Sequence, residues 1–179
     1  MFSITGISGQ VGGAVAHNLL AAHQPVRAVV RDLRKGEAWA QRGCEVVKAD
    51  ITDRAALTAS FEGAEAVFVL VPPNFDPLPE FSEARAIGAV LRSALEAAHP
   101  GRVVYLSTIG AQATQSNLLT QHTIIEQVLE PLPMPSTFLR PDGSWKTVVG
   151  MSLGHVSMGR SQAFFSSLIS HFRRWQPPT

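Results

Sequence analysis

The sequence predicts an α/β fold in which a doubly wound parallel sheet carries helices on both of its faces. Short apolar runs of strand length alternate with longer segments in which apolar residues recur at helical spacing. The short runs are apolar almost throughout, which is the pattern of strands that are buried on both faces. Right-handed crossovers would bring the carboxyl ends of these strands to one edge of the sheet, where we expect the ligand site.

Each expected strand is bounded by a turn signal or by a residue that stops it. The first run ends at Gly6, and Pro25 stands directly before the second run. The fourth run is stopped by Pro72 and Pro73, because proline has no N–H to donate to a sheet. The expected strands are Met1–Thr5, Val26–Val30, Glu45–Ala49, Glu65–Val71, Val103–Ser107 and Thr137–Leu139.

The segments between these runs have the periodicity or the composition of helices. In the first segment apolar residues recur at helical spacing from Val11 to Ala22, and the fourth is long and rich in alanine. We expect Thr52 to cap the third helix, Gly63 to end it, and Pro131 to end the fifth. The expected helices are Gln10–Ala22, Lys35–Arg42, Asp53–Phe61, Glu80–Ala98 and Leu118–Glu130.

Composition limits the size of the domain and the classes of partner. The 179 residues are 45% hydrophobic, which is enough for one domain with a buried core. The net charge of +1 gives no strong attraction to nucleic acid or to a membrane surface. No apolar run approaches the roughly 20 residues that cross a bilayer. Cys44 is the only cysteine, which excludes a disulfide within the chain and leads us to expect a cytoplasmic protein.

A glycine-rich turn follows the first expected strand and opens the first expected helix. It comprises Gly6, Ser8, Gly9, Gln10, Val11 and Gly12. Gly6 permits a tight turn, Gly9 lets the backbone approach a phosphate, and Gly12 lets the helix pack close to the sheet. The helix N-terminus then presents its N–H groups to the anion. This strand–turn–helix context predicts a Rossmann-type domain that binds the pyrophosphate of NAD or NADP, and the alternative is that the glycines serve the turn alone.

The end of the second strand bears on the choice between the two cofactors. The chain there reads Val30-Arg31-Asp32, with Arg34 and Lys35 close behind. Arg31 can pair with the 2′-phosphate of NADP, whereas Asp32 can accept a hydrogen bond from the free ribose 2′-hydroxyl of NAD. Because the position favours Arg31, we expect NADP(H) in preference to NAD(H). The alternative is that Arg31 and Arg34 are solvated residues at a helix start.

Three further strand ends supply candidate cofactor contacts. Asp50 and Ile51 follow the third strand, and an acidic residue there can accept from the adenine amino group. Val71 and Pro72 follow the fourth strand and expose its last carbonyl groups beside the cofactor. Ser107 ends the fifth strand and can face the nicotinamide or a substrate. The alternatives are a capped turn at Asp50, a simple strand stop at Pro72 and a strand-end cap at Ser107.

His122 and Glu126 are four residues apart in the fifth expected helix and therefore share one face. His122 is a candidate for contact with substrate or cofactor, and the alternative is a surface or interface histidine. Two such residues are too few for a metal site, so we expect no metal. The single tyrosine, Tyr105, is followed four residues later by Ile109, so the Tyr-x-x-x-Lys pair of short-chain dehydrogenases is absent.

Taken together, several segments resemble the NmrA-like group of atypical short-chain dehydrogenases. The resemblance rests on Thr5–Gly12, Val29–Arg31, Lys48–Asp53, Val67–Pro73, His122–Glu126 and Thr137–Pro141. It implies a Rossmann domain over residues 1–141 that binds NADP(H), with His122 matching a family histidine. The cofactor contacts that it implies are Gly6, Ser8, Gly9, Gln10, Val11, Arg31, Asp50 and Val71.

The same resemblance implies three functions between which the sequence leaves the choice open. The group includes quinone oxidoreductases and dye reductases, in which hydride passes directly to an electrophilic small-molecule acceptor that the protein positions. It also includes redox sensors that bind NADP(H) and a protein partner without catalysis. A third possibility is an inactive cofactor-binding fragment. We also expect that Glu80–Ala98 can serve an interface between copies of the chain.

The resemblance stops at Asp142, and residues 142–179 form an atypical tail. Back-translated as GAT GGT TCA TGG AAA ACN and read from the third base, Asp142–Thr147 becomes W-F-M-E-N, which resembles the family continuation. With the same offset Arg174–Thr179 reads M-A-T-A-D. Residues 1–140 contain 21 alanines and residues 141–179 contain one. We therefore hypothesise out-of-frame translation after residue 141, with a genuinely divergent tail as the alternative, and expect part of the substrate pocket to be missing.

Overall fold

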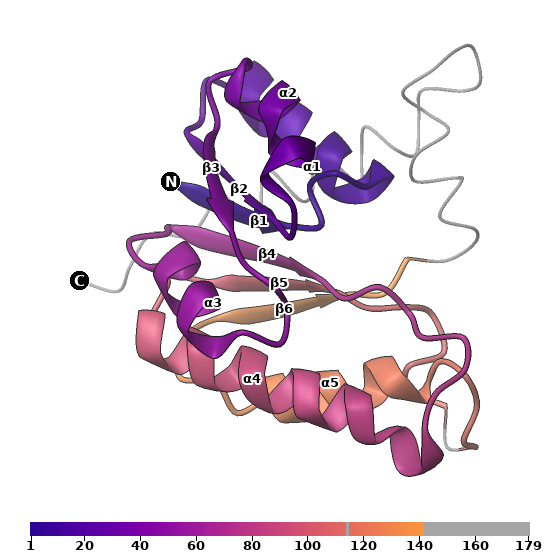
Figure 1. Ribbon diagram of the computed structural model, residues 1–179. Helices are drawn as coiled ribbons and strands as arrows, with labels where there is room; N and C mark the ends of the chain where they lie inside the picture. The colour runs from indigo at the N-terminus through magenta and orange to yellow at the C-terminus, as the bar shows by residue number, and fades with distance from the viewer. Residues whose placement is uncertain (114, 142–179) are drawn as a thin grey trace.

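The computed structural model describes residues 1–113 and 115–141, so the hypothesis about residues 142–179 lies outside the described residues. Six parallel strands form one sheet in the order β3-β2-β1-β4-β5-β6 (Figure 1). The order reverses between β1 and β4, which is the doubly wound Rossmann-type arrangement that the sequence predicts. The strands are β1 Phe2–Thr5, β2 Val26–Val30, β3 Glu45–Lys48, β4 Ala66–Leu70, β5 Val103–Leu106 and β6 Ser136–Leu139.

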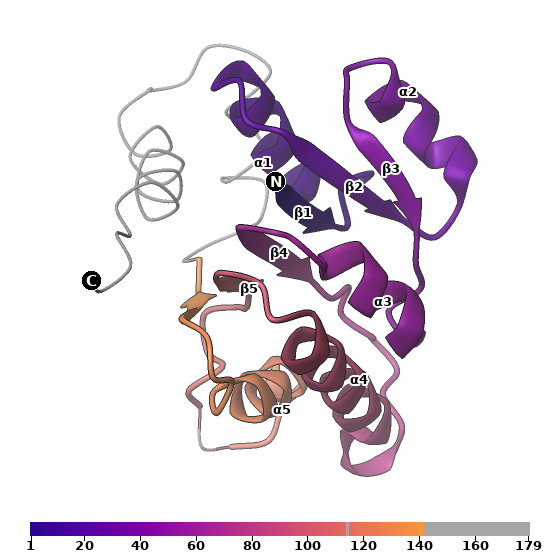
Figure 2. The same ribbon diagram turned by 90° about the vertical axis from the view of Figure 1, so that its left-hand side faces the viewer.

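Helices cover both faces of this sheet, as predicted. Figure 1 shows α1 and α2 on one face and α3, α4 and α5 on the other, and Figure 2 shows α4 and α5 side by side. The α-helices are α1 Gln10–Ala21, α2 Glu37–Ala40, α3 Arg54–Phe61, α4 Ser82–Ala98 and α5 Thr120–Leu129. Two 3-10 helices, η1 Leu33–Gly36 and η2 Pro79–Phe81, precede α2 and α4.

The sheet separates two apolar cores, and β4 contributes to both. Ala66 and Phe68 belong to the core that also contains Trp39 of α2, whereas Val67 and Val69 belong to the core on the side of α3, α4 and α5. Successive side chains of a strand point to opposite faces, so a strand between two helical layers must be apolar at consecutive positions. This geometry explains why the strands read as continuous apolar runs.

Two predicted helices begin or divide at residues that the sequence pattern did not identify. The predicted helix Glu80–Ala98 begins at Ser82, because Glu80 and Phe81 have φ of 57° and 55°. Residues in this left-handed region do not continue a right-handed helix. The predicted helix Lys35–Arg42 is replaced by η1 and the single turn of α2.

The predicted cap of α3 is wrong by one residue. Asp53, not Thr52, is the N-cap, and its carboxylate accepts a hydrogen bond from the backbone N–H of Ala56 at 3.0 Å. Thr52 instead donates its hydroxyl to the Asp50 carboxylate at 2.7 Å. The Thr52 hydroxyl is thus bound to the carboxylate two residues before it, and Asp53 takes the capping role.

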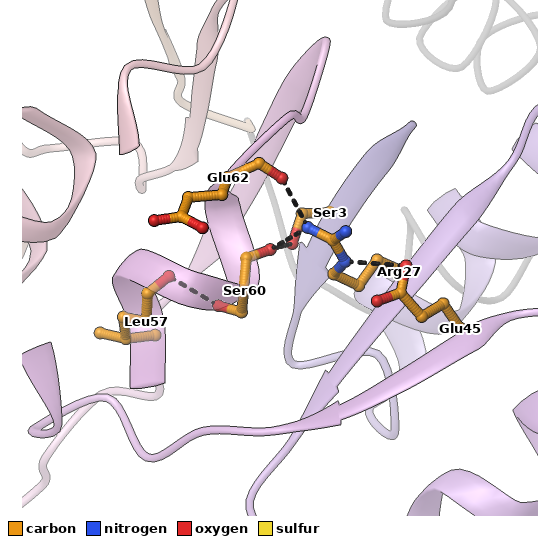
Figure 3. Close-up of polar contacts among 6 residues, drawn as sticks. All are labelled: Ser3, Arg27, Glu45, Leu57, Ser60 and Glu62. Atoms are coloured by element: carbon orange, nitrogen blue, oxygen red, sulfur yellow. Dashed lines mark hydrogen bonds and ion pairs between the residues drawn. The ribbon is translucent and has the colours of Figure 1, made fainter. Parts of the chain in front are cut away.

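At the amino edge of the sheet, Arg27 of β2 fastens the end of α3 (Figure 3). Its Nη1 donates to the carbonyl groups of Ser60 and Glu62 at 3.0 and 2.8 Å, where the last carbonyls of a helix have no partner within the helix. The hydroxyl of Ser3 donates to the same Ser60 carbonyl at 2.8 Å, and Arg27 forms an ion pair with Glu45 at 3.0 Å. The network lies at the opposite edge from the carboxyl ends of the strands.

Candidate functional site

The glycine turn connects β1 to α1 in a conformation that depends on its glycines. Gly6 has a φ of 66°, in the left-handed region that favours glycine, and its carbonyl accepts from the N–H of Gly9 at 2.9 Å. A Cβ on Gly12 would stand only 2.4 Å from the carbonyl oxygen of Gly6. The turn and the first turn of α1 therefore pack backbone against backbone.

The N-terminus of α1 begins at this turn without a capping side chain. Gly9 is the N-cap and has extended φ and ψ of −89° and 174°, but it brings no side-chain oxygen to the first-turn N–H groups. Ser8 and Gln10 are exposed beside it. The first N–H groups of a helix have no partner within the helix, and they carry its positive dipole end. This arrangement suits an external anion at the start of α1.

A pocket of about 280 Å³ opens at the carboxyl ends of β1, β2 and β4. It lies where the strand order reverses, the point at which open α/β sheets bind ligands. Its walls are Thr5, Gly6, Ser8, Gly9, Val29, Val30, Arg31, Ala49, Ile51, Leu57, Leu70 and Pro72. The wall is mostly apolar side chains and glycine backbone, with one charged side chain, that of Arg31.

The predicted cofactor residues divide into three groups by position. Those that line the pocket are Gly6, Ser8, Gly9, Arg31, Ile51 and Pro72. Adjacent in the chain to lining residues, or in the first turn of α1, are Gln10, Val11, Gly12, Asp50 and Val71. Ser107 lies outside the pocket wall. The wall residues that the sequence reasoning missed are Thr5, Val29, Val30, Ala49, Leu57 and Leu70, most of which end strands that were predicted.

Asp32 and Arg34 are paired with each other at the end of β2. The Asp32 carboxylate accepts from the backbone N–H of Arg34 at 3.1 Å and from its Nη2 at 2.9 Å. These hydrogen bonds hold the pKa of Asp32 below its ordinary value. Arg31 lines the pocket with an exposed side chain, and no ion pair or hydrogen bond of the described residues engages it. Asp32, which could bind the ribose of NAD, is therefore engaged by Arg34, whereas Arg31, which could bind the 2′-phosphate of NADP, lines the pocket.

Asp50 is held by the turn that follows β3. Its Oδ1 accepts from the backbone N–H and the hydroxyl of Thr52 at 2.9 and 2.7 Å. These bonds lower the pKa of Asp50, and the charge of Arg31 lowers it further. The geometry is that of a capped turn, the alternative that the sequence left open, with Asp50 exposed at the pocket edge between Ala49 and Ile51.

His122 lies in the interior and does not reach the pocket wall. Its exposed fraction is 7%, and its Nδ1 lies 2.7 Å from the hydroxyl of Tyr105, which is fully buried. Burial lowers the pKa of His122 despite the nearby charge of Glu126, and burial raises the pKa of Tyr105. Both groups are therefore neutral near pH 7 and join β5 to α5. This position favours a packing role for His122 over contact with substrate or cofactor.

One turn further along α5, the buried carboxylate of Glu126 forms an ion pair with Arg140, whose side chain is 41% exposed. Arg140 follows β6 directly, and its Nε donates to the Glu126 carboxylate at 2.9 Å while its Nη2 contacts the other oxygen. Burial opposes ionisation of Glu126, but Arg140 and Ser107 outweigh burial and hold its pKa below the ordinary value. The Ser107 hydroxyl is buried and close to Glu126 but forms no well-aligned hydrogen bond. Glu126 on α5 thus interacts with Ser107 at the end of β5 and with Arg140 at the end of β6.

Two further hollows occur among the described residues, and one of them adjoins the pocket. One, of about 310 Å³, shares Pro72 with the pocket and is mainly apolar, between the loop after β4 and the helices α4 and α5. The other, of about 980 Å³, lies over α5 and the end of β6 and includes Arg140. Among residues 1–113 and 115–141, no group of three or more His, Cys, Asp or Glu side chains could hold a metal ion.

Comparison with known proteins identifies the family to which this fold belongs. Residues 6–143 match the NAD(P)H-binding family, and this span begins at the first glycine of the turn. The chain belongs to the NAD(P)H-binding family. This finding confirms the predicted resemblance to NAD(P)H-dependent reductases. Within the described part of the chain, no helix is both long and apolar enough to span a membrane.

Individual relatives in this family are reductases. The chain is 28% identical to quinone oxidoreductase 2 of Escherichia coli (strain K12) over 142 residues, which are 78% of this chain and 48% of that protein. It superimposes on the triphenylmethane reductase of Citrobacter sp. with a TM-score of 0.72 and 26% identity, over 82% of this chain and 50% of that one.

A second similar structure contains a cofactor. The NADPH-dependent quinone oxidoreductase of Escherichia coli in complex with NADPH matches with a TM-score of 0.68 and 26% identity, over 85% of this chain and 52% of that one. The chain therefore spans about half the length of the relatives that it matches. The family of this chain is one that binds NAD(P)H. The relatives whose names state a substrate are longer proteins than this chain.

Proposed function

We propose that the pocket binds the adenosine and pyrophosphate part of NADP(H) and that the whole protein reduces quinones or similar electrophilic acceptors. The observation that supports it best is the union of the glycine turn, the uncapped start of α1 and Arg31 in one pocket. The close approach at Gly12 and the missing cap at Gly9 are features that an anion at the helix start would use.

Under this proposal Arg31 selects NADP(H) over NAD(H). Arg31 lines the pocket, no hydrogen bond or ion pair among the described residues engages its side chain, and a 2′-phosphate is a strong acceptor for a guanidinium group. Asp32, which would accept from the 2′-hydroxyl of NAD, already receives hydrogen bonds from Arg34. Lys35 and Lys48 add positive charge near Asp32, and this charge favours a dianionic group at the same end of the pocket.

The cofactor supplies a hydride, and the part of the protein described here supplies position. Gly6 and Gly9 let the backbone approach the pyrophosphate, while Ile51 and Leu57 offer apolar surface to the adenine. Tyr105 bonds to His122 in the interior, so neither is placed to move a proton at the pocket. A direct transfer to an acceptor that is held in position requires no such donor. Among residues 1–113 and 115–141, the lack of a proton donor placed at the pocket also supports the second candidate, a redox sensor that binds NADP(H) without turnover.

The test is a calorimetric titration of the chain and its variants with NADP⁺ and NAD⁺. Arg31→Ala should weaken NADP⁺ binding about 10- to 100-fold, the effect of losing a hydrogen bond to a charged group, and leave NAD⁺ binding nearly unchanged. Arg34→Ala releases Asp32 and should improve NAD⁺ binding. Arg92→Ala, which breaks an exposed pair with Glu96 on α4, is the control.

Each outcome separates the candidates. Binding of NADP⁺ that is unaffected by Arg31→Ala would refute the role of Arg31, and failure of both cofactors to bind would refute the proposed pocket. Oxidation of NADPH in the presence of a panel of quinones then decides between the reductase and the sensor. Turnover supports the reductase, whereas tight binding without turnover supports the sensor or the inactive cofactor-binding fragment.

A further inference from the structure

The loop after β4 carries Pro72 to the rim of the pocket, and this loop has few backbone N–H groups by which the rest of the protein could bind it. Pro72 and Pro73 have no N–H, so the first backbone donor after Val71 is the N–H of Asn74. The side chain of Gln121 in α5 accepts from this N–H through Oε1 at 2.8 Å. Its Nε2 donates in return to the carbonyl of Asn74 at 3.2 Å. One side chain thus engages both backbone groups of a residue 47 positions away.

Gln121 is committed to this contact. Its exposed fraction is 5%, and its Nε2 also donates to the carbonyl of Leu118 at 2.8 Å. The amide oxygen and both amide hydrogens therefore have partners, which is the condition for burying an amide at low cost. Asn74 is held a second time through its own side chain, which donates to Glu83 and accepts from the N–H of Asp76 at 3.0 Å.

We propose that Gln121 is a positioning residue for the cofactor, which acts through Asn74 to hold Pro72 against the pocket. Gln121 does not line the pocket but lines the adjoining cavity that shares Pro72. The rings of Pro72 and Pro73 fix the φ angles of both residues. Pro72 at the pocket rim is therefore joined to the anchored residue Asn74 by a stiff segment of the chain. This inference rests on the proposed function of the pocket.

The experiment compares Gln121→Leu with a matched control, Ser3→Ala. Gln121→Leu substitutes an apolar side chain of similar size and removes both bonds to Asn74 together with the bond to Leu118, and it should raise the Kd for NADP⁺ about tenfold. Ser3→Ala removes one buried hydrogen bond, to the Ser60 carbonyl at the amino edge of the sheet (Figure 3). It should lower the melting temperature and leave the Kd within about twofold of the wild type. Hydrogen exchange at the Asn74 amide should accelerate in Gln121→Leu alone.

Gln121→Glu supplies a rescue that depends on pH. When ionised, its carboxylate can still accept from the Asn74 N–H but faces the carbonyls of Asn74 and Leu118 with no hydrogen to donate. When protonated, it regains one donor. The ratio of its Kd to that of the wild type should therefore fall toward one as the pH is lowered. The corresponding ratio for Gln121→Leu should not change. If Gln121→Leu fails to fold, the pH dependence of Gln121→Glu relative to the wild type carries the test by itself.

The possible outcomes distinguish this inference from the function on which it rests. If the wild-type chain binds NADP⁺ and Gln121→Leu binds it equally well, the positioning role is refuted and the proposed function stands. The same holds if Gln121→Glu has one unchanging ratio at every pH. A wild-type chain that does not bind NADP⁺ refutes the proposed function and, with it, this inference.

Discussion

Gly12→Ala is the substitution that tests the geometry of the glycine turn most directly. An added Cβ would stand 2.4 Å from the carbonyl oxygen of Gly6 and 2.7 Å from its carbonyl carbon, inside the 3.0 Å that real Cβ atoms keep. Both atoms belong to the backbone, so no side chain can rotate away. The turn and α1 would have to separate by the missing 0.6 Å or more.

This displacement sets the expected magnitude of the effect. Overpacking of this kind costs about 1–3 kcal/mol, and each kcal/mol lowers the melting temperature of a domain of this size by about 3 °C. The displacement would also move the first-turn N–H groups of α1, which under the proposed function face the pyrophosphate, so the Kd for NADP⁺ should rise by about tenfold or more. A thermal-shift titration with NADP⁺ measures both effects in one experiment.

Gly101→Ala is the matched control for this prediction. A Cβ there would stand 2.6 Å from the carbonyl oxygen of Glu65, a comparable clash between backbone segments at the start of β5. It should lower the melting temperature to a similar extent but leave the affinity for NADP⁺ unchanged. If Gly12→Ala binds NADP⁺ as tightly as Gly101→Ala does, the close approach at Gly12 serves packing alone and the reasoning is refuted.

Two further predictions concern the parts that hold the sheet and helices together. Arg27→Leu should lower the free energy of unfolding by about 2–4 kcal/mol, because it removes charged donors from the Ser60 and Glu62 carbonyls. Urea denaturation measures this loss, and wild-type stability would contradict it. Burial lowers the pKa of His122, so the unfolded chain takes up the proton more readily and stability should fall as the pH drops below 6.5. His122→Gln should flatten this slope, and an unchanged slope would disprove the assignment.

The fold could largely be predicted from the sequence, because the signals of its strands and turns are local. Val67 and Val69 face one core and Ala66 and Phe68 the other, and a strand buried in this way is apolar at every position. The start of α4 was not readable, because it depends on a positive φ at Phe81, a residue type that rarely adopts this conformation. Backbone strain of this kind is set by tertiary packing and leaves no mark in composition.

Part of the candidate site could likewise be predicted from the sequence, because the signals of that part are local. The glycine turn and Arg31 can be recognised from a few consecutive residues, and the pairing of Asp32 with Arg34 is also local. Gln121 could not be found in this way, because a glutamine in a helix has no signature until its partner is known. That partner is the backbone of Asn74, on another element.

The residues that line the pocket and the residues that set its shape therefore come from different parts of the chain. Every wall residue precedes Asn74, so the first four strands and the segments between them supply the whole surface of the pocket. Pro72, however, lies on a loop whose first available donor is taken by α5, and α5 is in turn held to β5 through Tyr105 and to the end of β6 through Arg140. The second half of the described domain thus contributes no surface to the pocket but fixes one of its walls.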